Sequence, residues 1–508
     1  MKKVNQLKAG AILSYINLAI STIIPLIYTP VMLRLMGQSE YGLYSLANSV
    51  ISYLSLLTFG MGGAVTRYIT KFRAEKNKKS LEEVAGLFLL FYFIAALLVC
   101  IVGIIIMINT KYIFSNGLSE TELAKLKVLV LIMALSTAIS FLVSVFSSIV
   151  GSFERYIFQR VVDIVSSVLM PVANLFILFL GYRSIGLALI ALFFQVAYGV
   201  IYFTYCVKKL KIRPRFDDMP IELSKEIMGF SLFIFISSLA DLLFWSTDKV
   251  LIGAMISSTA VAVYNVGGVF TSMLQSMSAA ISNVFVPKVT SMVVLKNDIN
   301  ELSELLIKIG RIQCYVVSLI LSGFIIFGKI FIHYWSGDEY MDAYYIALVT
   351  MIPISIPLIQ SIAYNIILAQ KKHGFRSIVY CTIAVINMIG TYIFIPRYGI
   401  IGAALCTCIA FLLGNGLILN LYYWKYIKLD IPLFWKNIFR ISIIPCVLTL
   451  VCRFLFNQVL IPNSFIDLGI YIILYSFLYF IICWLFSMND YEKQLLKSTF
   501  WKYLKYRK

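Results

Sequence analysis

The sequence predicts an all-α integral membrane protein with about 14 transmembrane helices, each built from roughly 20 apolar residues. The chain has 508 residues, of which 61% are hydrophobic and only 13% are charged. Soluble domains contain about 45–50% apolar and about 25% charged residues, so this composition belongs to another class of protein. Long apolar runs recur along the whole chain, and a mean hydropathy of +0.90 agrees with this interpretation.

The apolar runs define the individual spans. The first one follows a short basic stub without an A-x-A-like cleavage site, so we expect a retained helix rather than a signal peptide. Glycines and prolines inside several spans, such as Gly60 and Pro353, mark positions where the helices are expected to bend. The predicted spans are 11–33, 41–63, 84–108, 126–151, 161–180, 185–206, 226–254, 258–286, 310–332, 343–367, 377–396, 400–424, 439–461 and 465–487.

The basic residues concentrate in alternate loops. The N-terminal stub, every second loop and the C-terminal tail together hold 34 of the 43 Lys and Arg residues. Because basic loops stay in the cytosol, this bias predicts a multi-pass protein of the cell membrane with both termini cytosolic. The net charge is +19, and we expect the basic residues that produce it to contact anionic membrane lipids rather than nucleic acid. The basic loops are 64–83, 152–160, 207–225, 287–311, 368–376 and 425–440.

Few side chains are suited to catalysis or metal binding. The nine cysteines form no C-x-x-C pair, and the two histidines, His333 and His373, lie on opposite sides of the predicted membrane. No G-x-x-x-x-G-K-[ST] motif occurs, and no loop is long enough for a separate enzyme domain. We expect no metal, no cofactor and no enzymatic activity, with an integral-membrane glycan-assembly enzyme as the weakest alternative.

The chain repeats itself at an offset of 216 residues. ILFLGYRSIGLAL at 177–189 aligns with IFIPRYGIIGAAL at 393–405, and Arg160 aligns with Arg376. Because each repeat contains six spans, the two run in the same direction around a pseudo-twofold axis and enclose a central cavity. The predicted parts are an N-lobe at 1–207, a basic cytosolic linker at 208–225, a C-lobe at 226–424, a helix pair at 425–487 and a basic amphipathic tail at 488–508.

Three stretches of the sequence resemble a known family of transporters. They are LMGQSEYGLYSLANSV after the first span, GMGGAVTRYITKFRAEKN at the end of the second, and DLLFWSTDKVLIGAMISSTAVAVYNVG across the seventh and eighth. The chain is similar there to the polysaccharide transporters, which include the Wzx-type O-antigen and repeat-unit flippases. These belong to the multidrug/oligosaccharidyl-lipid/polysaccharide exporter superfamily.

The resemblance implies an alternating-access flippase for a polyprenyl-diphosphate-linked oligosaccharide repeat unit, moved from the cytosolic to the outer leaflet. It implies coupling to H+ or Na+ and contact with polysaccharide polymerase machinery. Flippases of the lipid-linked peptidoglycan precursor share the fold and are the first alternative. Multidrug exporters are the second; they typically have twelve spans, and one branch carries an aspartate in the first span, which AILSYINLAISTIIPLIYTPVML lacks.

Two aspartates interrupt the seventh predicted span. Asp241 and Asp248 are two helical turns apart and share a face with Trp245, while Lys249 lies beside Asp248. Charged groups inside a membrane avoid lipid, so this face is expected to line a cavity and to couple transport to an ion. The alternative is an interhelical ion pair that only locks the helices together.

A diphosphate substrate requires basic side chains near the helix ends. Arg34 lies at the outer end of the first span, Arg67 at the inner end of the second, Lys288 at the inner end of the eighth and Arg311 at the start of the ninth. Arginine binds phosphate oxygens two at a time, so Arg67 is the strongest candidate of the four for the diphosphate or its sugar. The alternative is that all four are ordinary basic residues at helix ends.

Overall fold

The computed structural model describes residues 6–217, 235–236, 238–295, 298–458, 462 and 464–494. Within these ranges the chain is almost entirely helical, and no described residue lies in a β-strand. The chain divides into two compact units, Met1–Ala262 and Val263–Lys508. The prediction of an all-α protein is therefore confirmed.

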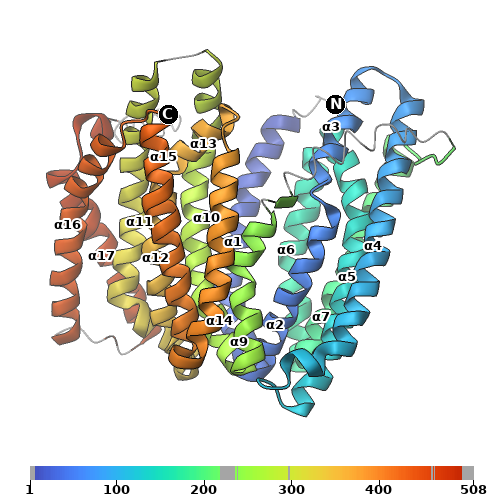
Figure 1. Cartoon of the computed structure of the whole chain (residues 1–508). Helices are drawn as coiled ribbons and strands as arrows, with labels where there is room; N and C mark the ends of the chain where they lie inside the picture. Colours follow the sequence, from blue (N-terminus) through green and yellow to red (C-terminus); the bar gives the residue numbers. More distant parts are fainter. Residues whose placement is uncertain are drawn as a thin grey trace. The chain divides into compact units, whose positions relative to one another are not determined.

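The first unit is a set of long helices joined by short turns (Figure 1). These are α1 (Gln6–Met36), α2 (Gln38–Leu54), η1 (Ser55–Thr58), α3 (Gly62–Ala74), α4 (Lys78–Phe114), α5 (Glu120–Ser152), α6 (Tyr156–Phe179), α7 (Arg183–Thr204), η2 (Tyr205–Leu210) and α9 (Thr247–Met255). Helix α5 packs along α4, α7 and α2, and α1 packs along α6. Leu46, Phe88 and Leu129 are among the apolar side chains buried between these helices.

The turn between α1 and α2 depends on one glycine. Gly37 has φ 79° and ψ 162°, a backbone conformation that only glycine adopts without strain. Its N–H donates to Leu33 O at 2.9 Å, and its own carbonyl accepts from the N–H of Tyr41 at 3.1 Å. A single residue therefore reverses the chain and starts α2.

The second predicted span, 41–63, is not one continuous helix. After η1, Phe59 and Gly60 both have positive φ angles, 48° and 68°, and α3 then begins at Gly62. Bending at Gly60 is thus confirmed, and it amounts to a complete break in the helix. Discontinuous membrane helices of this kind are common in transporters.

Segments that the charge pattern assigns to one side of the membrane gather at one end of the first unit. Arg73, in the last turn of α3, lies 3.4 Å from Glu154 in the turn between α5 and α6. Arg215 Nε lies 3.5 Å from Glu82 Oε2 in α4. The structure thus agrees with the grouping of these loops, while their cytosolic location stays a prediction.

The second unit contains the remaining helices and most of α10 (Ser258–Val294). They are α11 (Ile299–Ser336), η3 (Asp338–Tyr340), α12 (Ala343–Ile359), α13 (Ser361–Ala369), α14 (Gly374–Phe411), η4 (Leu412–Ile418), α15 (Leu419–Lys425), α16 (Ile431–Gln458) and α17 (Phe465–Phe486). Helix α11 packs against α12, α16 and α17, and α12 packs against α14 (Figure 1). Ile366, Phe411 and Phe434 are buried within this unit.

Twelve helices in the described part of the chain are long and apolar enough to cross a membrane. One of them, Gly374–Lys425, covers two predicted spans, 377–396 and 400–424, and is kinked at Gly399, where φ is 58° and ψ is −143°. The seventh predicted span, 226–254, lies partly outside the described residues. The chain is a multi-pass membrane protein, and the count of fourteen spans stays a prediction.

The boundary between the two compact units, after Ala262, lies later in the chain than the predicted linker between the lobes, at 208–225. Helix α9 packs against α2 and α4, and the first unit continues to Ala262. The sequence repeat, in contrast, assigns the segment from residue 226 onward to the C-lobe. The compact units reflect packing and the lobes reflect repetition, so the lobe boundaries stay a prediction.

Candidate functional site

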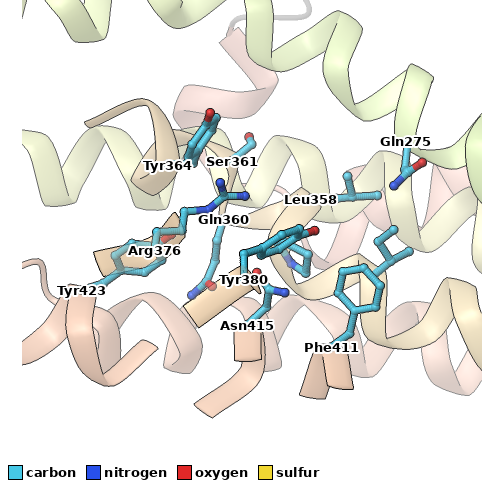
Figure 2. Close-up of a pocket in the computed structure, with 12 residues that line it drawn as sticks. Gln275, Leu358, Gln360, Ser361, Tyr364, Arg376, Tyr380, Phe411, Asn415 and Tyr423 are labelled. Atoms are coloured by element: carbon cyan, nitrogen blue, oxygen red, sulfur yellow. The ribbon is translucent and has the colours of Figure 1, made fainter. Parts of the chain in front are cut away.

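A cavity of about 190 Å³ lies in the second unit, where α12, α13, α14 and the π-helical turn η4 meet (Figure 2). No Asp or Glu is among the twelve residues that line it. Polar and aromatic groups share the wall. They include three amide side chains, Gln275, Gln360 and Asn415, and three tyrosines, Tyr364, Tyr380 and Tyr423.

Arg376 is the single charged side chain in this wall. Its guanidinium carbon lies 4.1 Å from the centroid of the Tyr364 ring and 5.0 Å from that of Tyr380 (Figure 2). Such cation–π contacts stabilise a cation by about 0.5–2 kcal/mol each. Arg376 also donates a hydrogen bond to the Tyr423 hydroxyl and interacts with it electrostatically. Within the described ranges, Arg376 forms no ion pair with a carboxylate.

The π-helical turn shapes one wall of the cavity. In η4 the backbone hydrogen bonds span one residue more than in an α-helix, a feature frequent at functional sites. The turn places Asn415 in the cavity wall, one turn after Phe411. Asn420 Nδ2 donates to the carbonyl oxygens of Asn415 and Gly416, at 2.7 and 3.0 Å. The side chain of Asn420 therefore stabilises the irregular backbone.

Buried amides hold the polar wall in place. Gln360 Nε2 donates to Asn420 Oδ1 at 2.7 Å, and Trp435 Nε1 donates to the same oxygen at 2.8 Å. On the neighbouring turn, Gln313 Nε2 donates to Ser361 Oγ at 2.8 Å. Because these side chains already have partners, their orientation is set in the protein itself, as a binding site requires.

The sequence did not reveal this cavity. Its residues come from six helical elements between Gln275 and Tyr423, so no short motif contains them. One usable signal was present, the alignment of Arg376 with Arg160 in the repeat. Arg160 Nη1, however, lies 2.9 Å from Asp163 Oδ2 and forms a local ion pair on α6.

The two aspartates of the seventh span have different surroundings, although their spacing places them on one helical face. Asp241 is exposed and Asp248 is only 1% exposed, while Trp245 and Lys249 are half-buried. The helix is interrupted at Ser246, where φ is −110°, and the spacing argument assumes a regular helix. The proposed role of these residues in ion coupling stays a prediction.

Helix α9 is anchored to α2 next to Asp248. The hydroxyl groups of Tyr53 and Thr247 are 2.5 Å apart. Both residues belong to the first unit, as does Asp248. Asp248, next to Thr247 in the chain, interacts electrostatically with Tyr53, so the buried aspartate lies near the contact between α2 and α9.

Arg34 and Arg67 belong to the first unit, and Lys288 and Arg311 belong to the second. Arg34, Arg67 and Lys288 are exposed, and none of the four lines the cavity of the second unit. Arg311 is only 7% exposed, and its Nε and Nη2 donate to Glu492 Oε1 and Oε2 at 2.5 and 3.0 Å. This buried ion pair engages Nε and Nη2 and indicates a structural role for Arg311, whose role as a diphosphate ligand stays a prediction. Roles for Arg34, Arg67 and Lys288 stay predictions.

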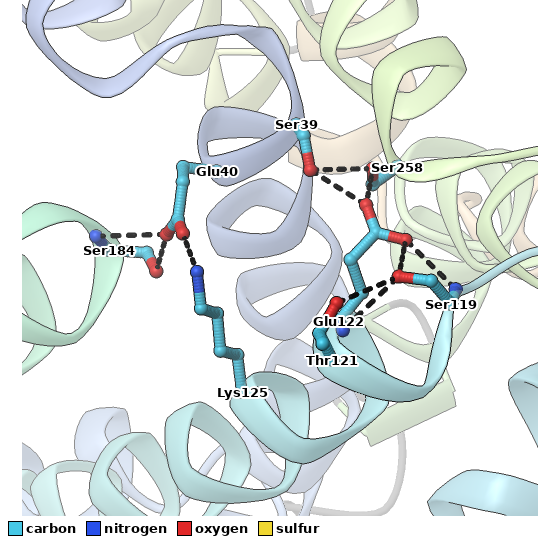
Figure 3. Close-up of polar contacts among 8 residues, drawn as sticks. All are labelled: Ser39, Glu40, Ser119, Thr121, Glu122, Lys125, Ser184 and Ser258. Carbon is cyan, nitrogen blue, oxygen red and sulfur yellow. Dashed lines mark hydrogen bonds and ion pairs between the residues drawn. The ribbon is translucent and has the colours of Figure 1, made fainter.

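Two carboxylates bind helices together elsewhere in the first unit (Figure 3). Glu40, in the first turn of α2, forms an ion pair with Lys125 of α5. It also accepts hydrogen bonds from the hydroxyl and the backbone N–H of Ser184, at the start of α7. Glu40 is 5% exposed, so this contact joins three helices through one buried carboxylate.

The second carboxylate, Glu122, accepts hydrogen bonds from hydroxyl groups and from a backbone N–H. It accepts from the hydroxyls of Ser39 at 2.7 Å and Ser258 at 2.5 Å (Figure 3). With Ser119 it also forms the capping box that starts α5. Both carboxylates are satisfied by protein groups, which indicates a structural role.

Comparison with known proteins places these features in context. Residues 7–293 match the family described as "Polysaccharide biosynthesis protein". A Shigella flexneri protein described as "Putative O-antigen transporter" is 21% identical over 413 residues, which cover 80% of this chain and 94% of that protein.

The fold is similar to two kinds of transporter whose structures are solved. A lipid II flippase MurJ in an inward closed conformation has a TM-score of 0.74 at 17% identity, covering 94% of this chain and 98% of that one. An inward-facing multidrug resistance MATE family transporter of the MOP superfamily has a TM-score of 0.63 at 16% identity, covering 83% and 99%. These relatives are transporters and flippases, which agrees with the prediction that the chain is not an enzyme.

Proposed function

Because the chain belongs to the polysaccharide biosynthesis protein family, we propose that it is an alternating-access flippase for a lipid-linked oligosaccharide. Its substrate is a polyprenyl-diphosphate-linked repeat unit, which it moves from the cytosolic to the outer leaflet of the cell membrane. The moved repeat unit is then used by polymerase machinery to assemble a cell-surface polysaccharide. The O-antigen transporter relative supports this choice of substrate class.

The cavity of the second unit is the observation that carries the proposal. Its amide and hydroxyl groups can hydrogen-bond to sugar hydroxyls, and its tyrosine rings offer apolar faces to a sugar ring. Its one charge, on Arg376, is positive. A cationic drug would be repelled by that charge, whereas an anionic lipid-linked sugar would be attracted. The cavity thus favours an oligosaccharide over a multidrug substrate.

The proposal includes an orientation and an energy source. Both termini lie in the cytosol, and the basic loops contact anionic lipids of the inner leaflet. The cavity then lies toward the cytosolic end of the second unit, because the basic turn 368–376 adjoins it. H+ or Na+ binding at Asp241 or Asp248 couples the ion gradient to transport.

Cells that lack the protein test this function. They are expected to accumulate the complete lipid-linked repeat unit with unaltered sugar composition, on the cytosolic face of the membrane. To find the side of the membrane on which the repeat unit accumulates, intact spheroplasts are digested with a glycosidase that does not cross the membrane. Repeat units on the cytosolic face should remain undigested. Accumulation of an incomplete repeat unit would identify an enzyme of sugar assembly and overturn the proposal.

Fold similarity to the lipid II flippase favours a second candidate function, transport of the lipid-linked peptidoglycan precursor. The same cells distinguish the two. Accumulation of the precursor, with cell lysis and normal surface polysaccharide, would support the second candidate. Accumulation of the polysaccharide repeat unit in cells that do not lyse supports the first.

A further inference from the structure

We propose that Arg376 binds the diphosphate group of the lipid-linked substrate, at the cytosolic end of the second unit. This inference rests on the proposed function, because it names the part of the substrate that the cavity holds. Arg376 was not among the diphosphate ligands predicted from the sequence.

The charge of Arg376 is not balanced by the described part of the protein. Arg73, Arg160 and Arg311 form ion pairs with carboxylates, at N–O distances of 3.4, 2.9 and 2.5 Å. Arg376 is half-buried and has no such partner within the described ranges. Partial burial of an uncompensated charge is unfavourable, so an anionic ligand would be stabilised here.

The guanidinium of Arg376 forms a side-chain hydrogen bond with Tyr423, which uses only part of its five N–H donors. Tyr364 and Tyr380 make their contacts through ring faces, which interact with the positive charge without accepting its N–H groups (Figure 2). The N–H donors of a guanidinium point outward in its plane, and two of them match two phosphate oxygens. Because the two rings restrain the side chain, less entropy is lost when the ligand binds.

Other cavity groups complete a site for an anion. Ser361 Oγ accepts a hydrogen bond from Gln313 Nε2, so its own O–H is available to donate. The wall includes no carboxylate that would repel a phosphate. The cavity, of about 190 Å³, has room for a group of the size of a diphosphate.

Anionic phospholipids also carry phosphate, and the test must separate them from the substrate. The full-length protein is purified and placed in nanodiscs of phosphatidylcholine. Radiolabelled farnesyl diphosphate then serves as the probe, with phosphatidylglycerol nanodiscs as the comparison. The proposal expects saturable binding of the probe that phosphatidylglycerol does not suppress.

Variants then test the residue itself. Arg376→Gln is expected to weaken probe binding about ten- to a hundredfold, the range for loss of a charge-assisted bidentate contact. The Arg376→Lys variant is expected to bind the probe with an affinity between those of wild type and Arg376→Gln. Lysine keeps the positive charge but lacks the planar guanidinium that binds two phosphate oxygens at once. Arg160→Gln is the matched control: it removes the arginine at the equivalent repeat position and should leave probe binding unchanged. Elution profiles and melting temperatures establish that each variant is folded.

The proposal is overturned if wild-type protein does not bind the probe, or if Arg376→Gln and Arg376→Lys bind it as tightly as wild type. Suppression of binding in phosphatidylglycerol nanodiscs would also overturn it and identify a lipid-headgroup contact. The flippase function is judged separately, in cells lacking the protein. Arg376-dependent binding without accumulation of a lipid-linked repeat unit would support the diphosphate site and reject the proposed transport function.

Discussion

The ion pair between Arg311 and Glu492 predicts a specific loss of stability. Substituting Glu492→Gln keeps the size of the side chain and removes its charge. Arg311 is 7% and Glu492 is 5% exposed, and both nitrogen–oxygen contacts between them are 3.0 Å or shorter. The variant therefore leaves a buried guanidinium without its counter-ion.

The size of this effect follows from burial and from the remaining contacts. Breaking a buried ion pair from one side costs about 3–5 kcal/mol. Glu492 Oε2 also accepts from the N–H of Asn489 at 2.9 Å and from the hydroxyl of Tyr315 at 3.3 Å, and a glutamine oxygen still accepts one of these bonds. We therefore expect about 3 kcal/mol, near the lower end of that range. For a unit of this size, about 2–4 °C per kcal/mol gives a melting temperature lowered by about 6–12 °C.

Thermal melting of the purified protein in detergent measures this loss. Glu304→Gln is the matched control, because Glu304 and Lys308 form an exposed i,i+4 pair at 3.0 Å. Such pairs contribute about 0.3–0.5 kcal/mol, so the control should melt close to wild type. Equal melting temperatures for Glu492→Gln and wild type would refute the argument from burial.

A charge-swapped variant, Arg311→Glu with Glu492→Arg, separates the structural role from substrate binding. We expect it to recover part of the lost stability and to support normal transport, measured as surface polysaccharide. Recovered stability without transport would show that Arg311 itself contacts the substrate, as the sequence-based interpretation held.

Three further predictions concern other parts of the chain. Glu40→Gln removes the counter-ion of Lys125 and should lower the free energy of unfolding by about 1–3 kcal/mol; an unchanged detergent melting curve would contradict this. Asp241→Asn should abolish or strongly reduce surface polysaccharide with normal membrane insertion, and Asp241→Glu should retain part of it; normal polysaccharide with a lower melting temperature would indicate a structural aspartate instead. In a background without native cysteines, an impermeant thiol reagent added outside should modify Asp338→Cys and spare Lys78→Cys; the reverse labelling would invert the topology.

The helical class and the family could be predicted from the sequence because they depend on local properties. Hydropathy over about 20 residues identifies a span without knowledge of its neighbours. The break near Gly60 and the interruption before residue 400 were predictable in the same way, since glycine and proline change the backbone where they occur. The family was suggested by the resemblance of three short stretches, each of which is also local in the sequence.

The cavity and the partner of Arg311 could not be predicted, because they depend on contacts between distant residues. Glu492 follows Arg311 by 181 positions, so the helix-end pattern around Arg311 gave no indication of an ion pair. The cavity needs the register shift of η4, which arises from packing and from the hydrogen bonds of Asn420. The spacing of Asp241 and Asp248 places them on one helical face, but it does not predict that Asp241 is exposed and Asp248 is buried. Burial depends on which helices pack nearby.

The π-helical turn η4 predicts that related sequences differ in length by one residue at this position. A π-helical turn contains one residue more than an α-helical turn, so deleting one residue within Leu412–Ile418 would restore a regular α-helix. The flanking segments would keep their faces, and the helix would still cross the membrane. Asn415 lies inside this turn, so its place in the cavity wall and the bonds that Asn420 makes to the carbonyl groups of Asn415 and Gly416 depend on the extra residue. A one-residue alignment gap at this position should therefore distinguish relatives that lack the cavity from relatives that have it.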